Sequence, residues 1–322
     1  MYGLAFEFIY GFCIGTHITF LGRIPSPKIV TDAFASVRPD VIITVPLVID
    51  KIIRKSVMPK LQTPLMRFVL SIPFVKNRIY KVVHDQLRKS LGGNFKELII
   101  GGAPLNREVE QMLRDIKMEF TVGYGMTEFA PILSYSGWAS YKLFSCGRPA
   151  PRMELKIDSE DPKTIVGEIL ARGENTMLGY YKNDEATAQF IDADGWCHTG
   201  DLGLMDEEGN VFIKGRSKSM ILGPSGQNIY PEEIEDKINS LNYVNESVVV
   251  DRDGRLTALV YPDFDRLKKH GVKGAAVSST IEGLVKSVNA VIPSYCQIAN
   301  VEICEEEFEK TPKKSIKRYL YK

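Results

Sequence analysis

Three short segments that read as β-strands constrain the fold of this chain more than any other feature. Val41–Pro46 is a continuous apolar run, Glu97–Gly102 is an apolar run that ends in two glycines, and Met118–Gly123 ends in a third. Such runs suit strands that are buried on both faces of a sheet. A helical pattern follows each of the first two, and the second begins near Asn106, a good helix cap. Strand, helix and strand in this order predict a mostly parallel sheet with crossover helices.

The predicted secondary structure changes twice in the remainder of the chain. Residues 146–217 read as short β segments separated by turns. Beyond them, Pro231 suits the first position of an amphipathic helix to Leu241, and Asp251–Gly254 suits the turn of a hairpin with strands Ser247–Val250 and Leu256–Tyr261.

These patterns predict an α/β protein with two domains. The first, residues 1–217, comprises a mostly parallel sheet part, 1–145, and a small β-rich part, 146–217. The second is a separate small α+β domain over 218–322, long enough to fold as a unit.

The composition argues against nucleic-acid binding and against a zinc site. Forty-one basic and 40 acidic residues give a net charge of +1, so no global field attracts nucleic acid or an anionic membrane, and we expect no nucleic-acid partner. The 5 cysteines lack C-x-x-C spacing and the 4 histidines lack metal-ligand spacing, which favours a protein of the reducing cytoplasm without a zinc site. Nothing in the composition implies a particular oligomeric state.

The first 20 residues are apolar and aromatic but carry Glu7 and His17. A membrane span needs about 20 uninterrupted apolar residues, and a signal peptide needs a basic start. We therefore expect a buried core element here and no transmembrane segment.

The stretch Gly123-Tyr124-Gly125-Met126-Thr127-Glu128 has the chemistry of a nucleotide site. Glycines on both sides of Tyr124 let the backbone approach a flat ligand, which the aromatic ring can cover. Thr127 supplies a hydroxyl and Glu128 a carboxylate, the pair that a phosphate and its Mg²⁺ require.

Three further motifs occur in order: Gly101-Gly102-Ala103-Pro104-Leu105, Gly195–Gly203 with Asp201 in it, and Ile213–Lys218 running into Gly223–Glu235. Together with the first motif they resemble the AMP-forming acyl-CoA ligases of the adenylate-forming superfamily, relatives of luciferases and peptide-synthetase adenylation domains. Within that family the chain is most similar in character to the long-chain fatty-acid–CoA ligases.

The resemblance implies a reaction in two halves, with ATP, Mg²⁺ and coenzyme A taking part. A carboxylic acid attacks the α-phosphate of ATP to give acyl-AMP and pyrophosphate, and the thiol of coenzyme A then displaces AMP. This chemistry needs positioning and charge neutralisation rather than a protein nucleophile.

The resemblance also assigns roles to residues. Gly101, Gly102 and Ala103 would form the floor of the adenine slot and Tyr124 would stack on the base. Thr127 would bind the α-phosphate and Glu128 the Mg²⁺. Asp201 would accept hydrogen bonds from the ribose hydroxyls, and Arg216 would contact ribose or phosphate.

Further roles follow for the second domain. Lys218 would be the hinge about which residues 218–322 move as a lid between the half-reactions. The loop with Gly223, Gly226 and Asn228 would admit coenzyme A.

The chain departs from the family pattern at two places. Ser315 occupies the position of the family's catalytic lysine, which a serine cannot replace in charge, although Lys314 or Lys317 lie nearby. A Gly/Ser/Thr-rich loop ending in Pro-Lys-Gly, which in the family wraps the β- and γ-phosphates, is not found in the sequence. We therefore expect the chain to correspond to the C-terminal part of a longer ligase and to be inactive alone. The alternative is a non-catalytic nucleotide- or acyl-binding protein derived from the same fold.

Overall fold

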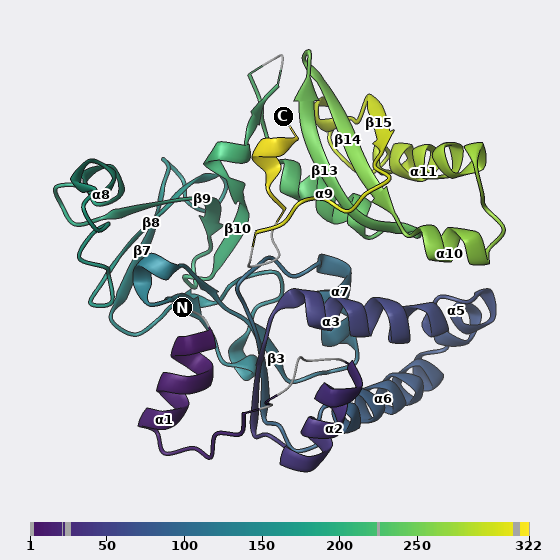
Figure 1. Ribbon diagram of the computed structural model, residues 1–322, viewed down its shortest axis with the longest axis horizontal. Helices are drawn as coiled ribbons and strands as arrows, with labels where there is room; N and C mark the ends of the chain where they lie inside the picture. Colours follow the sequence, from purple (N-terminus) through teal and green to yellow (C-terminus); the bar gives the residue numbers. More distant parts are fainter. Residues whose placement is uncertain (1–2, 21, 23–26, 224–225, 312–315, 322) are drawn as a thin grey trace. The chain divides into compact units, whose positions relative to one another are not determined.

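A computed structural model describes residues 3–20, 22, 27–223, 226–311 and 316–321 (Figure 1). The chain forms two compact units. The first comprises Met1–Lys156, Leu170–Thr199 and Met205–Phe212, and the second comprises Ile157–Ile169, Gly200–Leu204 and Ile213–Lys322. The domain boundary expected between residues 217 and 218 stays a prediction.

The predicted parallel sheet lies in the first unit. Strands β1 (Val41–Thr44), β2 (Glu97–Ile100) and β3 (Phe120–Val122) are ordered β1-β2-β3, and both pairings are parallel. Ile42, Leu98 and Phe120 are paired in register and are buried on one face of the sheet. Ile43 and Ile99 on the other face are half-buried, so the expected burial on both faces is complete only in β3. The α/β fold class is therefore confirmed.

Helices precede and connect these strands and complete the core around them (Figure 1). They are α2 (Pro27–Val37), α3 (Pro46–Ile52), α4 (Met58–Leu61), α5 (Pro64–Leu70), α6 (Pro73–Ser90) and α7 (Arg107–Asp115). A short π-helical turn, Ile53–Val57, joins α3 to α4. Asn106 caps α7 as predicted, since its side chain accepts hydrogen bonds from the amides of Glu108 and Val109.

Two further sheets are formed by strands between residues 124 and 216, so β strands of this kind begin before residue 146. Strands β4 (Tyr124–Gly125), β5 (Ile132–Tyr135) and β6 (Arg148–Pro149) form one sheet with antiparallel pairings. A second sheet has the order β10-β9-β8-β7, built from β7 (Met153–Asp158), β8 (Gly167–Gly173), β9 (Cys197–Met205) and β10 (Val211–Arg216). The helix α8 (Asp184–Phe190) stands between β8 and β9 in the sequence.

The second unit contains the predicted α+β fold. Its sheet is ordered β13-β14-β15, from β13 (Val244–Arg252), β14 (Arg255–Pro262) and β15 (Asn300–Ile303), and the helices α9 (Pro231–Asn239), α10 (Phe264–Lys269) and α11 (Ala275–Val288) accompany it. Val249, Ala258 and Val260 pack in a core with helix residues such as Ile238 and Val285.

The hairpin differs in detail from the expectation. Arg252 pairs with Arg255, so the turn is the two-residue Asp253-Gly254 with positive φ at both positions, 52° and 74°, and both strands are longer than predicted. Helix α9 begins at Pro231 as expected but ends at Asn239 rather than Leu241.

The expectation of a buried core element at the beginning of the chain is wrong. Leu4–Tyr10 forms a π-helix followed by α1 (Gly11–Cys13), and Phe12 and Phe20 are 72% and 75% exposed. Composition indicated how apolar the segment is, but burial also requires a neighbouring element that covers it. Among the described residues, no helix has the length and apolar character to cross a membrane.

Candidate functional site

The carboxyl ends of the three parallel strands bring Gly101, the first residue of the predicted adenine slot, and Gly123 to one edge of the sheet. The amide of Gly101 donates to the carbonyl of Thr44 at 3.1 Å, and the amide of Gly123 donates to the carbonyl of Ile100 at 2.9 Å. Gly102 has φ +87°, a conformation that favours glycine, and both Gly102 and Ala103 are exposed. Open backbone at this edge of a parallel sheet is where ligands of such folds bind.

Tyr124 follows directly on this edge. It lies in β4, pairs with Ser134 of β5, and is only 7% exposed. A flat ligand that stacks on its ring needs one ring face uncovered, so the predicted stacking stays a prediction.

Gly125 is where the chain has no room for a side chain. A Cβ atom there would lie 2.0 Å from the carbonyl oxygen of Pro131, and that oxygen also accepts a hydrogen bond from the amide of Met126 at 2.8 Å. The contact of Gly125 and Met126 with Pro131 therefore holds together the two ends of the loop that carries Thr127 and Glu128.

Thr127 and Glu128 lie in a short 3₁₀ turn, Thr127–Phe129, whose Phe129 is fully buried and anchors it. Thr127 is exposed and Glu128 is half-buried. The hydroxyl of Tyr180 donates to Glu128 Oε1 at 3.0 Å, and the amide of Met177 donates to the Glu128 carbonyl at 2.8 Å. Burial raises the pKa of Tyr180 to about 12, and the hydrogen bond to Glu128 adds to this, so the phenol stays a donor at neutral pH.

A second contact holds the same loop. The side-chain amide nitrogen of Asn175 donates to the carbonyls of Phe129 at 2.5 Å and Ile132 at 3.0 Å. The sequence motifs gave no indication of Tyr180 or Asn175, because a phenol or an amide 43–52 residues away follows no spacing rule.

The surroundings of Glu128 show whether the described residues could bind Mg²⁺. The described part of the chain contains no group of three or more His, Cys, Asp or Glu side chains that could hold a metal ion. Mg²⁺ in nucleotide-dependent enzymes is commonly bound through one or two carboxylates together with substrate phosphates and water. A half-buried, oriented carboxylate beside an exposed threonine hydroxyl fits that mode.

Asp201 and Arg216 meet in the second unit. Asp201 lies in β9 and is 4% exposed, and its Oδ1 atom is 2.9 Å from Nε of Arg216 at the end of β10. The Arg216 side chain is 69% exposed, so its guanidinium lies open to other partners. A buried carboxylate held by an arginine is a strong acceptor for a pair of hydroxyl groups.

The backbone beside Asp201 is held in place by two further contacts. The Gly200 amide donates to Glu168 Oε1 at 2.8 Å, and the Gly200 carbonyl accepts from the Ser217 hydroxyl at 3.2 Å. Glu168 was not identified from the sequence.

The predicted hinge and coenzyme A loop follow β10. Lys218 is exposed in a 3₁₀ turn, Ser217–Ser219. Gly223 and Asn228 lie on the two sides of a tight hairpin between β11 (Ile221–Leu222) and β12 (Asn228–Ile229), and Gly226 near its tip has φ +81°. The Gly226 amide donates to the carbonyl of Gly223 at 2.9 Å.

Ser315 and Lys314 lie outside the described residues. The segment that contains them is bracketed by an antiparallel bridge between Lys310 and Ile316. Lys317, the other nearby lysine, is 3.1 Å from Glu309 Oε2.

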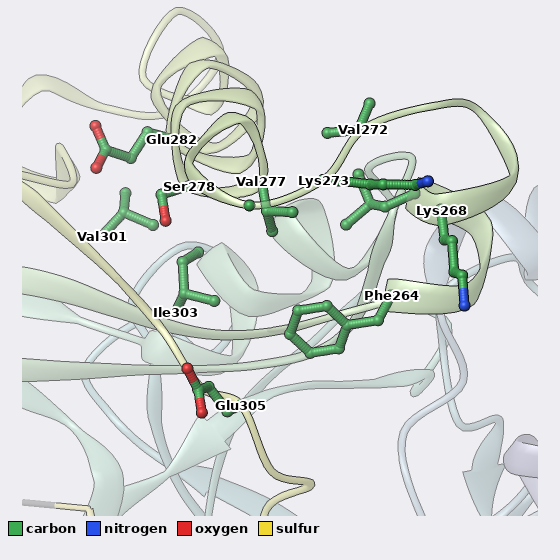
Figure 2. Close-up of a pocket in the computed structure, with 12 residues that line it drawn as sticks. Phe264, Lys268, Val272, Lys273, Val277, Ser278, Glu282, Val301, Ile303 and Glu305 are labelled. Atoms are coloured by element: carbon green, nitrogen blue, oxygen red, sulfur yellow. The ribbon is translucent and has the colours of Figure 1, made fainter.

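A separate open cavity of about 740 Å³ lies in the second unit, among α10, the start of α11 and β15. Figure 2 shows apolar side chains such as Val277 and Ile303 at its centre, with Lys268 and Lys273 on one side and Glu282 and Glu305 on the other. Its lining residues include none of those predicted from the sequence motifs.

Comparison with known proteins agrees with these features. The model of the AMP-binding enzyme family matches residues 1–181, and that of the AMP-binding enzyme C-terminal domain matches residues 218–321. The long-chain-fatty-acid–CoA ligase FadD15 of Mycobacterium bovis is 31% identical over 259 residues, 74% of this chain and 42% of its own length. The long-chain-fatty-acid–CoA ligase ACSBG1 of Bos taurus is 31% identical over 52% of this chain and 23% of its own length.

Solved structures have the same fold. O-succinylbenzoate coenzyme A synthetase (MenE) of Bacillus subtilis, in complex with AMP, has a TM-score of 0.71 at 20% identity, over 96% of this chain and 56% of its own. A benzoate CoA ligase of Burkholderia xenovorans has a TM-score of 0.72 at 19% identity, over 99% of this chain and 58% of its own. The chain spans less than half the length of the curated relatives that it matches. By its matched domains and relatives, the chain belongs to the AMP-binding enzyme family, the adenylate-forming acyl-CoA ligases.

Proposed function

We propose that this chain takes part in joining a long-chain fatty acid to coenzyme A through an acyl-adenylate, as an ATP-dependent, AMP-forming ligase of the cytoplasm. The observation that carries the proposal is the buried carboxylate of Asp201, held 2.9 Å from Arg216 inside the family motif. The similarity to two long-chain-fatty-acid–CoA ligases supports the substrate class. The 5 free cysteines support a reducing compartment.

In this proposal the chain's residues bind and orient the reactants. Gly101, Gly102 and Ala103 line the adenine, and Tyr124 stacks on it. Thr127 donates to the α-phosphate where the fatty-acid carboxylate forms its new P–O bond and the bond to pyrophosphate breaks. Mg²⁺, when bound at Glu128, supplies neutralising charge to the phosphates.

Asp201 and Arg216 supply the ribose contacts, and residues 218–322 serve the coenzyme A half-reaction. Asp201 accepts from the ribose hydroxyls and Arg216 contacts ribose or phosphate. The coenzyme A sulfur forms the thioester bond to the acyl carbon, AMP leaves, and the thiol proton passes to solvent. Residues 218–322 move as a lid about Lys218, with Gly223, Gly226 and Asn228 beside the pantetheine; the family model that begins at residue 218 supports this division.

A second function is favoured by one feature of the tail. Ser315 stands where the family has its catalytic lysine, and Lys317 is paired with Glu309. A chain without that cation would bind nucleotide without forming the adenylate.

A product assay separates the two functions. Because we expect the chain alone not to form the adenylate, it is incubated with preformed acyl-AMP of graded acyl length and coenzyme A, and AMP and acyl-CoA are measured by mass spectrometry. Acyl-CoA formation that peaks with long acids supports the ligase. AMP binding without either product supports the non-catalytic protein.

Replacement of Asp201 by alanine is expected to weaken AMP binding by about 1.5–3 kcal/mol, the range for hydrogen bonds to a charged group. Asp201→Asn keeps the shape and removes the charge, so it should lose most of the same affinity. Calorimetry measures the change, with Asp251→Ala, an exposed aspartate of β13, as the control. Unchanged affinity in a folded Asp201→Ala protein would remove Asp201 from the nucleotide site.

Tyr180→Phe is expected to weaken Mg·ATP binding by about 1–2 kcal/mol while AMP binding stays unchanged, because the lost hydroxyl orients Glu128 and AMP does not need the ion. Tyr181→Phe is the matched control, since Tyr181 is 89% exposed. Titrations with Mg·ATP and with AMP measure both affinities. Equal losses for the two nucleotides would show a general structural effect and contradict the orienting role.

A further inference from the structure

Helix α5 and the turn into α6 expose large apolar side chains together. Leu65 and Phe68 of α5 are 74% and 71% exposed, and Ile72 and Phe74, at the start of α6, are 47% and 76% exposed. We name these four residues the α5 face. Large apolar side chains exposed as a group, rather than singly, indicate an interaction surface.

The opposite side of the same helix already packs in the core. Met66 and Leu70 of α5 contact the core of the first unit, as do Ile79 and Val83 of α6. Helix α5 is therefore apolar all round except for Arg67, although only one side is covered by the described chain. A helix with this pattern needs an apolar environment on its second side as well.

The segment that carries the α5 face is basic. From Lys51 to His84 the sequence has 8 lysine and arginine residues and no acidic residue, whereas the whole chain is nearly neutral. Arg67 and Arg78 are exposed, and neither pairs with an acidic side chain in the described part of the chain. Arg78 follows Phe74 by four residues in α6, so the two side chains share one side of that helix.

We propose that the α5 face binds the surface of an anionic lipid bilayer, with Phe68 and Phe74 inserted at the headgroup boundary and the exposed Arg67 and Arg78 against lipid phosphates. Apolar side chains flanked by lysine and arginine fit an interface of this kind, where apolar burial and attraction to anionic lipid act together. The long stems of arginine and lysine can lie along the apolar layer while their charges stay at the headgroups. This surface shares no residue with the nucleotide motifs, so the proposal is independent of the ligase assignment.

Co-sedimentation with vesicles tests the proposal. We expect the unmodified chain to bind vesicles of phosphatidylcholine mixed with phosphatidylserine, to bind phosphatidylcholine vesicles much less, and to dissociate as salt is added. Phe68→Ser/Phe74→Ser should weaken binding by at least about tenfold, since two aromatic side chains no longer enter the interface. The control Leu178→Ser/Val291→Ser removes side chains that are 103% and 68% exposed elsewhere, and should bind as the unmodified chain does.

If the serine variant fails to fold, a variant that replaces exposed arginines tests the same proposal. Arg67→Gln/Arg78→Gln should weaken binding by about fivefold for each residue removed, while Lys268→Gln/Lys269→Gln, an equal charge change in the second unit, should not. The proposal is overturned by absent binding, by equal binding to neutral and anionic vesicles, or by equal losses in test and control variants. Self-association that disappears in Phe68→Ser/Phe74→Ser, without vesicle binding, would assign the face to a second copy of the chain and overturn it too.

Discussion

Replacement of Arg318 by leucine is expected to destabilise the second unit by about 3–5 kcal/mol, the range for breaking a buried ion pair. Arg318 Nη1 is 2.6 Å and 2.7 Å from the two carboxylate oxygens of Glu235, which lies on α9 and is 7% exposed. The same carboxylate accepts the amide of Val249 at 2.6 Å. The leucine variant leaves a buried carboxylate without its cation.

The loss should depend on pH. Burial raises the pKa of Glu235 to about 7, against the opposing effects of Arg318 and the Val249 amide. Because this folded-state pKa is above the ordinary value of 4.5, the folded chain binds the proton more tightly, and the contribution of Glu235 to stability falls as pH rises from about 4.5 through about 7. Protonation of Glu235 also removes the unpaired negative charge in Arg318→Leu. The variant should therefore lose less stability at pH ~5 than at pH ~8.

Hydrogen exchange in β13 measures the effect, because both tryptophans, Trp138 and Trp196, lie in the first unit and their fluorescence should stay unchanged. The double variant Glu235→Gln/Arg318→Leu should recover most of the loss, since the neutral side chain still accepts the Val249 amide. A single variant with unaltered exchange, or a double variant as unstable as the single, would show that the pair does not hold the tail of the chain to α9.

Gly125→Ala is expected to cost about 3 kcal/mol, the upper end for overpacking, and to remove nucleotide binding. The new Cβ would lie 2.0 Å from the Pro131 carbonyl oxygen and 2.9 Å from its carbon. Both are backbone atoms, so no rotation of a side chain relieves the contact, and the loop with Thr127 and Glu128 has to move.

Gly283→Ala is the matched control. Gly283 is exposed inside α11 with no atom within 4 Å of its Cβ position, and alanine there should stabilise the helix by about 0.5–1 kcal/mol. Urea unfolding followed by tryptophan fluorescence, together with AMP titration, reports on Gly125→Ala. A variant with unchanged stability and unchanged AMP affinity would contradict the close packing of this loop.

The parts of the fold that follow local rules were predictable from the sequence. The apolar runs at 41–46 and 97–100 contain the parallel strands β1 and β2, because short continuous apolar runs are typical of strands inside a sheet. Asn106 caps its helix because a short polar side chain reaches the free amides of the first turn.

Features that depend on distant neighbours were not predictable. Asn245 and Glu246 interrupt the apolar pattern, so the sequence placed the start of β13 at Ser247 although the strand begins at Val244 beyond a bulge. The support of Glu128 by Tyr180 joins residues 52 apart, and only the folded chain brings them together.

A calorimetric titration of the unmodified chain with AMP is the measurement to make first. We expect saturable binding at a single site that Asp201→Ala weakens and Asp251→Ala leaves intact. A folded chain that binds no AMP would contradict the assignment of its motif residues to a nucleotide site.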